Sequence, residues 1–344
     1  MIKQLIKEGF ILKSKGYYKH AIEAFYKALE LDNKSPELLL EIAELYFLMG
    51  KEEHALSYIK QILDTNPVHI GSLELLEKIF LEKGALEDAE QTAKNIYCIT
   101  HKTKDFERIF EILIQEEKYS EIFTYNTEEN SPKITYLSAL AKYRLNELQD
   151  AENLINKALC MEQNQDFLLL KGQILLKENK DDECKNLLNE IKIDENNPEI
   201  LNFAGLVEQR FGNYRKALEY FQTALKLKPQ NDEYNYNCAS TYFKMGENSL
   251  ARKFYNMAIS INPENNSYHL ALANLYYSEK LYKRAMEELY GDFYEARLLK
   301  SIILYDTGYL ALAKKELQEL EKICPKDNIV TDYIEKIRTE LSIN

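Results

Sequence analysis

Small residues recur with a period of about 34 residues along most of the chain. One column of the repeat consists of Gly9, Ala43, Ala139, Gly172, Gly205, Ala239 and Ala273. A second column, twelve residues later in each unit, consists of Ala21, Ala55, Ala89, Ala151, Cys184, Ala217, Ala251 and Ala285. A period of this length is typical of solenoids, in which each unit buries its apolar face by stacking on its neighbours. We therefore expect a chain that grows by addition of units and has no single central core.

Each unit has the pattern of two helices joined by a tight turn. In residues 232–265 the apolar and small side chains recur at three- and four-residue spacing, as one face of a helix requires. The first run consists of Tyr236, Cys238, Ala239, Tyr242 and Phe243, and the second of Leu250, Ala251, Phe254, Tyr255, Ala258 and Ile259. Gly246 separates the two runs and Pro263 ends the second. This pattern predicts a helix, a turn and an antiparallel helix.

These columns resemble those of the tetratricopeptide repeat (TPR) family. Residues 198–231 match it at Leu201, Gly205, Gly212, Tyr214, Ala217, Phe221, Ala224 and Pro229, and residues 2–35 match it at Gly9, Gly16, Tyr18, Ala21, Phe25 and Ala28. The family's tryptophan is absent, and Leu5, Leu39, Leu73 and Leu201 stand in its place. The resemblance covers nearly the whole chain. It implies an all-α, right-handed superhelical solenoid of about ten helix-turn-helix repeats, with the first helix of each repeat lining a concave groove.

The repeat register divides the chain into arms. Residues 1–103 are expected to form an N-terminal arm of three repeats, and residues 132–327 a C-terminal arm with a short repeat at 266–293. Between them, residues 104–131 form a degenerate, acidic short repeat with three Lys or Arg against eight Asp or Glu. Phe110 and Ile122 occupy its small-residue columns, a polar run spans 126–132, and Glu77 occupies a small-residue column just before it. We interpret this region as a bend, a hinge or a second site.

The two ends of the repeat array differ. Residues 328–344 predict a capping helix with Val330, Ile334, Ile337 and Leu341 on one side, and Asp332, Glu335, Lys336, Arg338 and Glu340 on the other. The first helix has no such cap and begins with Ile2, Leu5 and Ile6. An alternative function follows from this uncapped end: a self-assembling structural protein that acts as a homo-oligomer through its N-terminal end.

Composition limits the partners and the compartment. A net charge of -12 argues against general affinity for nucleic acid, which depends on Lys and Arg displacing counterions. No apolar run is long enough to cross a membrane. Five scattered cysteines without a Cys-x-x-Cys pair indicate free thiols in a reducing compartment. The prediction is a cytoplasmic protein without membrane insertion.

No motif for catalysis or for a cofactor is present. Phosphate loops, nucleophile elbows and metal quartets are missing from the sequence. His20 and His54 lie one repeat apart, but no carboxylate or thiol completes a zinc site in sequence, so surface histidines are the better interpretation. We expect no enzyme activity, no metal and no cofactor.

A row of cations lies near the end of the first helix in four successive repeats: Arg144, Lys177, Arg210 and Lys244. The resemblance implies that this column faces the concave groove. Such a row attracts an acidic peptide or a free C-terminal carboxylate through charge-assisted hydrogen bonds. The same cations also complement the helix dipole, and both interpretations remain open.

Polar and aromatic residues are expected beside this row. Asn202, Asn237 and Asn274 have amide groups suited to hydrogen bonding with a peptide backbone, and Phe243 and Tyr277 are candidate apolar anchors. Only Asn237 falls in a column of the clamp with which some TPR relatives grip chaperone tails, so that specificity is not expected. The leading hypothesis is a non-catalytic protein-protein interaction scaffold that binds a peptide or helix of a partner in the concave groove.

The small-residue columns yield a first prediction. Replacing Ala251 with Leu should overpack the contact between the two helices of its repeat and lower the free energy of unfolding by about 1 to 3 kcal/mol. Urea unfolding followed by circular dichroism measures this change. A variant as stable as the wild type would contradict the close helix approach.

Overall fold

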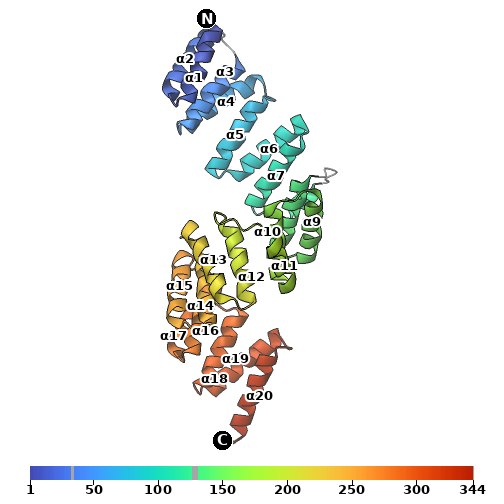
Figure 1. Cartoon of the computed structure of the whole chain (residues 1–344), viewed down its shortest axis with the longest axis vertical. Coiled ribbons are helices and arrows are strands. Elements are labelled where there is room, and N and C mark those ends of the chain that lie inside the picture. The colour runs from blue at the N-terminus through green and yellow to red at the C-terminus, as the bar shows by residue number, and fades with distance from the viewer. Residues whose placement is uncertain (32–34, 126–130, 344) are drawn as a thin grey trace. The chain divides into compact units, whose positions relative to one another are not determined.

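The computed structural model describes residues 1–31, 35–125 and 131–343, without the side chains of 341–343 (Figure 1). These ranges contain twenty α-helices, one short 3-10 helix and no strand, which confirms the all-α class. Two compact units make up the chain, Met1–Ile174 and Leu175–Asn344. The division predicted at residues 103 and 131 stays a prediction. Among the described residues, no helix has both the length and the apolar character needed to cross a membrane.

The first unit consists mainly of antiparallel helix pairs. Its helices are α1 (Ile2–Ser14), α2 (Tyr18–Leu31), α3 (Pro36–Leu48), α4 (Glu52–Thr65), α5 (Ile70–Lys83), α6 (Leu86–Thr100), α7 (Thr103–Gln115), η1 (Glu121–Thr124), α8 (Pro132–Arg144) and α9 (Leu148–Met161). Helix α10 (Gln165–Lys177) begins in this unit and ends in the next. Each odd-numbered helix from α1 to α5 packs on the even-numbered helix that follows it, and α8 packs on α9.

The second unit continues the same arrangement. Its helices are α11 (Asp181–Glu190), α12 (Pro198–Arg210), α13 (Tyr214–Leu227), α14 (Asp232–Lys244), α15 (Asn248–Ile261), α16 (Asn266–Ser278), α17 (Tyr282–Glu288), α18 (Tyr294–Asp306), α19 (Leu310–Ile323) and α20 (Asn328–Ile343). Pairs α12–α13, α14–α15, α16–α17 and α18–α19 stack in chain order. In each pair we call the leading helix the first helix.

A left-handed residue marks the turn inside every repeat. Residues with positive φ stand at ten such turns: Gly16, Gly50, Gly84, Glu117, Asn146, Asn179, Gly212, Gly246, Lys280 and Gly308. The two short repeats keep their first helix and this turn, and they lose length in the second helix. The second helix is the four-residue η1 in one of them and the seven-residue α17 in the other, compared with 14 residues in α13.

The small columns permit close approach of the paired helices. A Cβ atom placed on Gly9 would lie 2.5 Å from the Phe25 ring, and one on Gly205 would lie 2.5 Å from the Phe221 ring. Both rings are fully buried. Glycine, which has no side chain, therefore stands on the first helix where a phenylalanine ring of the second helix fills the space.

The degenerate repeat fills its core with the large residues that interrupt the pattern. Phe110 and Ile122 are buried, and they form one cluster with Phe106, Ala89 and Ala93. The large side chains of Phe110 and Ile122 fill space that the short η1 leaves in place of a full second helix. The polar run predicted to cut this helix lies mostly at 126–130, outside the described residues.

The last helix covers the end of the array. Buried Val330, Ile334 and Ile337 of α20 pack with Leu317 and Leu320 of α19. The exposed residues of α20 include Asp332, Glu335, Lys336, Arg338 and Glu340, while the side chain of Leu341 lies outside the described part. The predicted two-sided pattern of α20 is thus present, and its role as a cap of the repeat array stays a prediction.

The turn of the second short repeat generates a stability prediction. Lys280 has φ 59°, a conformation that disfavours residues with a Cβ atom. Lys280→Gly should raise the free energy of unfolding by about 1 kcal/mol, since glycine relieves this strain. Lys253→Gly, in the middle of α15, is the control and should lower it by about 1 kcal/mol. Urea unfolding measures both, and a destabilised Lys280→Gly would contradict the strained turn.

Candidate functional site

The cations predicted to bind a partner have different environments. Arg144 is exposed in the first unit, and Lys177 is exposed at the end of α10 in the second. Arg210 instead reaches the preceding turn, where its Nη2 donates to the backbone oxygen of Leu176 at 2.7 Å and its Nη1 pairs with Asp181. A carbonyl at the C-terminal end of α10 thus has a cationic partner on α12, which is favourable for the dipole of α10.

Arg210 and Lys244 lie close together. The Nζ of Lys244 donates to Oε1 of Gln209 at 3.0 Å. Burial, and then repulsion from Arg210, lower the pKa of Lys244. The structure therefore brings these two predicted residues together, and both use part of their hydrogen-bonding capacity within the protein.

Asn202 and Asn237 belong to a buried polar seam between α12 and α14. Nδ2 of Asn237 donates to Oδ1 of Asn202 at 2.8 Å, and Nδ2 of Asn202 donates to Glu233 at 3.0 Å. Further along, Nε2 of Gln209 donates to Oγ1 of Thr241 at 2.7 Å. Asn202 and Asn237 are 8% and 5% exposed. Because these amides are satisfied internally, they hold two first helices in register.

The remaining predicted residues lie on α14 and α16. Nδ2 of the exposed Asn274 donates to the Leu270 backbone oxygen at 2.9 Å. Phe243 and Tyr277 are half-buried and pack against the same core cluster. The Tyr277 hydroxyl donates to Asp306 at 2.8 Å, and burial together with this carboxylate raises the pKa of Tyr277.

The first unit has a pocket of about 430 Å³ between α3 and α5 that the sequence reasoning did not select. Its lining consists of Leu40, Glu44, Phe47, Leu48, Gly71, Glu74, Leu75 and Lys78, all on first helices. Phe47 and Leu75 are buried, whereas Leu48 is 48% exposed. Phe47 occupies the same repeat position as the predicted anchor Phe243, and this was the signal that the sequence offered.

Charged residues surround the apolar lining of this pocket. Nζ of Lys13 lies 2.6 Å from both Glu41 and Glu44, and Nζ of Lys78 lies 5.0 Å from the centre of the Phe47 ring. Glu74 forms no ion pair with any residue that the structure describes. A Cβ atom on Gly71 would lie 2.7 Å from the Leu40 side chain, so glycine lets Leu40 lie against the start of α5.

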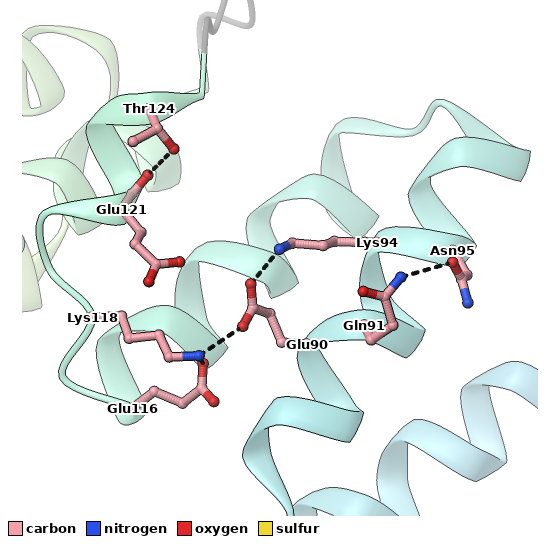
Figure 2. Close-up of polar contacts among 8 residues, drawn as sticks. All are labelled: Glu90, Gln91, Lys94, Asn95, Glu116, Lys118, Glu121 and Thr124. Carbon is pink, nitrogen blue, oxygen red and sulfur yellow. Dashed lines mark hydrogen bonds and ion pairs between the residues drawn. The ribbon is translucent and has the colours of Figure 1, made fainter.

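A charge network connects the repeats around the degenerate unit (Figure 2). Glu90 of α6 pairs with Lys94 and with Lys118, whose Nζ lies 3.1 Å from Glu90 and 3.2 Å from Glu116. Burial raises the pKa of Glu116. These pairs join α6 to the turn after α7. Within the described ranges, no three His, Cys, Asp or Glu side chains are placed to hold a metal ion.

Glu77 is the least exposed carboxylate of this region. It stands in the small column of α5 and is 1% exposed, while Ala93 occupies the second-helix position that holds Phe25 or Phe221 in other repeats. Arg108 of α7 contacts Oε1 of Glu77, at 2.9 and 3.0 Å. Buried Oε2 has no hydrogen-bond partner among the described residues. Burial outweighs the attraction of Arg108 and raises the pKa of Glu77.

The stacked helix pairs define an α-solenoid. Comparisons with known proteins agree with this fold. The model of a tetratricopeptide repeat family matches residues 14–79 and 210–275. A TPR repeat-containing protein of Methanocaldococcus jannaschii is 25% identical over 267 residues, which cover 70% of this chain and 46% of that protein. The match thus spans about half of the relative's length.

A solved structure supports the same fold. A chain in the crystal structure of the APC/C hetero-tetramer Cut9-Hcn1 superposes with a TM-score of 0.61 and 12% identity, covering 98% of this chain and 76% of that chain. The chain therefore resembles tetratricopeptide-repeat proteins in the residues that the family model matches and in its helical fold. Proteins with such repeats are generally protein-protein interaction scaffolds and typically not enzymes.

The buried carboxylate of Glu77 predicts a pH dependence of stability. Because its pKa is raised on folding, Glu77 favours the folded state at low pH and loses this contribution as the pH rises through the raised pKa. The wild type should therefore lose stability relative to Glu77→Gln as the pH rises over the range above about 4, the ordinary pKa of a glutamate. Urea unfolding over this range measures the difference, with exposed Glu82→Gln as control. A difference independent of pH would contradict the raised pKa.

Proposed function

We propose that this protein is a non-catalytic scaffold that binds a segment of a partner protein on its first helices. The observation that supports this most directly is the pocket between α3 and α5. Its residues all come from first helices, and its lining combines apolar side chains with an acidic edge. A volume of about 430 Å³ is in the range of ligand pockets.

The pocket suits an apolar side chain of the partner. Leu48 is 48% exposed beside buried Phe47 and Leu75, so a bound side chain removes apolar surface from water on both partners. Interfaces generally depend on a few such buried anchors surrounded by polar contacts. Glu44 and Glu74 supply the polar surroundings here.

The residues predicted in the second unit take distinct parts in this proposal. Phe243, Asn274 and Tyr277 are retained as contacts for a partner on the second unit itself, as are Lys177 and the remaining donors of Lys244. Asn202 and Asn237 act indirectly, because their amides hold α12 and α14 in register. The same proposal places the protein in the cytoplasm, because free cysteines are typical of a reducing compartment.

Peptides selected from a random phage-displayed library on the immobilised protein test this function. Leu48→Ser should weaken the tightest selected peptide by about tenfold, because the variant removes part of a buried leucine contact. Isothermal titration calorimetry measures the affinity of the synthetic peptide.

The matched control is Leu312→Ser on α19, because Leu312 is similarly exposed at 54% and lies outside the pocket. It should bind the peptide like the wild type. Failure to select any peptide, or equal affinities of the wild type and Leu48→Ser, would overturn the assignment of this pocket.

A further inference from the structure

A second pocket, of about 800 Å³, lies in the second unit around the turn between α12 and α13. Helix α11 contributes Lys185 and Asn189 to its lining, and the two helices joined by the turn contribute Glu208, Arg215 and Lys216. Arg215 and Lys216 belong to a second helix and Lys185 to another, so this pocket is built differently from the one between α3 and α5. Three cations and one carboxylate line it.

The carboxylate is already neutralised. Glu208 is 7% exposed, and it accepts hydrogen bonds from Lys216 and, at 2.7 Å, from Asn213. Burial alone would raise the pKa of Glu208, but these two donors outweigh it and lower the pKa. Lys216 is therefore the counterion of Glu208.

Two cations of the lining form no ion pair with any residue that the structure describes. Nζ of Lys185 lies 4.1 Å from the centre of the Phe211 ring, a cation-π contact, and Lys185 also contributes to the attraction that lowers the pKa of Glu208. The exposed Arg215 has neither an ion pair nor a side-chain hydrogen bond among the described residues. The pocket thus carries excess positive charge in a chain whose net charge is -12.

We propose that this pocket binds an acidic segment of a partner protein. The guanidinium of Arg215 pairs with one carboxylate in bidentate fashion, and the ammonium of Lys185 pairs with a second. A volume of about 800 Å³ accommodates more than one side chain, so a short run of acidic residues suits it better than a single small anion. The sequence pattern assigned an acidic partner to the row Arg144, Lys177, Arg210 and Lys244. Arg210 already pairs with Asp181. Arg215 in this pocket forms no ion pair with any residue that the structure describes.

This binding is independent of the pocket between α3 and α5, and its test differs accordingly. Fluorescence anisotropy of a fluorescein-labelled hexaglutamate peptide measures binding to the full chain. Arg215→Glu should weaken binding by at least about tenfold, because it replaces attraction with repulsion. The variant places an acid in the first turn of α13, where the helix dipole favours it, so the fold is preserved.

The matched control is Lys283→Glu, which reverses an exposed cation at the same position of α17, the second helix of another repeat. It should bind like the wild type, and raising the salt concentration should weaken wild-type binding. Three outcomes would overturn the proposal: no binding by the wild type, equal losses in the two variants, or displacement of the peptide by equimolar inorganic phosphate, which would indicate a site for small anions.

Discussion

Close packing between the two helices of a repeat is the contact on which the rest of the structure depends. Where Gly205 meets Phe221, there is no room for even one additional carbon atom. The same pairing of a glycine on the first helix with a phenylalanine ring on the second recurs at Gly9 and Phe25. In a solenoid each repeat contacts only its neighbours, so these local contacts must supply stability that a globular domain draws from a shared core. The period in the sequence is the direct consequence of this repeated contact.

The short repeats show which part of the unit can be changed. Both lose residues from the second helix and keep the first helix with its left-handed turn. In the degenerate repeat, Phe110 and Ile122 fill the volume that a full second helix would occupy. Buried Glu77 and partly exposed Arg108 add an ion pair at the same place. Retention of the first helices preserves the surface proposed to contact partners, while the second helices absorb the variation.

Charged and polar side chains in this protein serve two different purposes. Asn202, Asn237 and Arg210 connect consecutive repeats, and their hydrogen bonds are made within the chain. Arg215 lines a pocket and has no such hydrogen bond within the part of the chain that the structure describes. An acidic protein that keeps a local positive pocket can attract an acidic partner there while its remaining surface repels one. The proposed apolar pocket between α3 and α5 would instead bind its own partner segment through burial of apolar surface, which depends little on salt.

Residue spacing alone was sufficient to identify the helix pairs, the turns and the TPR resemblance. Helix periodicity and the need for a small residue at the Gly and Ala columns are both local properties of the chain. The same columns pointed toward the first helices as the binding surface. Spacing could not distinguish a cation that is available from one that is already paired. The bonds of Arg210 to Leu176 and Asp181 join residues about 30 positions apart, and the distance from Arg215 to any carboxylate depends on how α11, α12 and α13 pack. Those interactions exist only after the repeats have stacked.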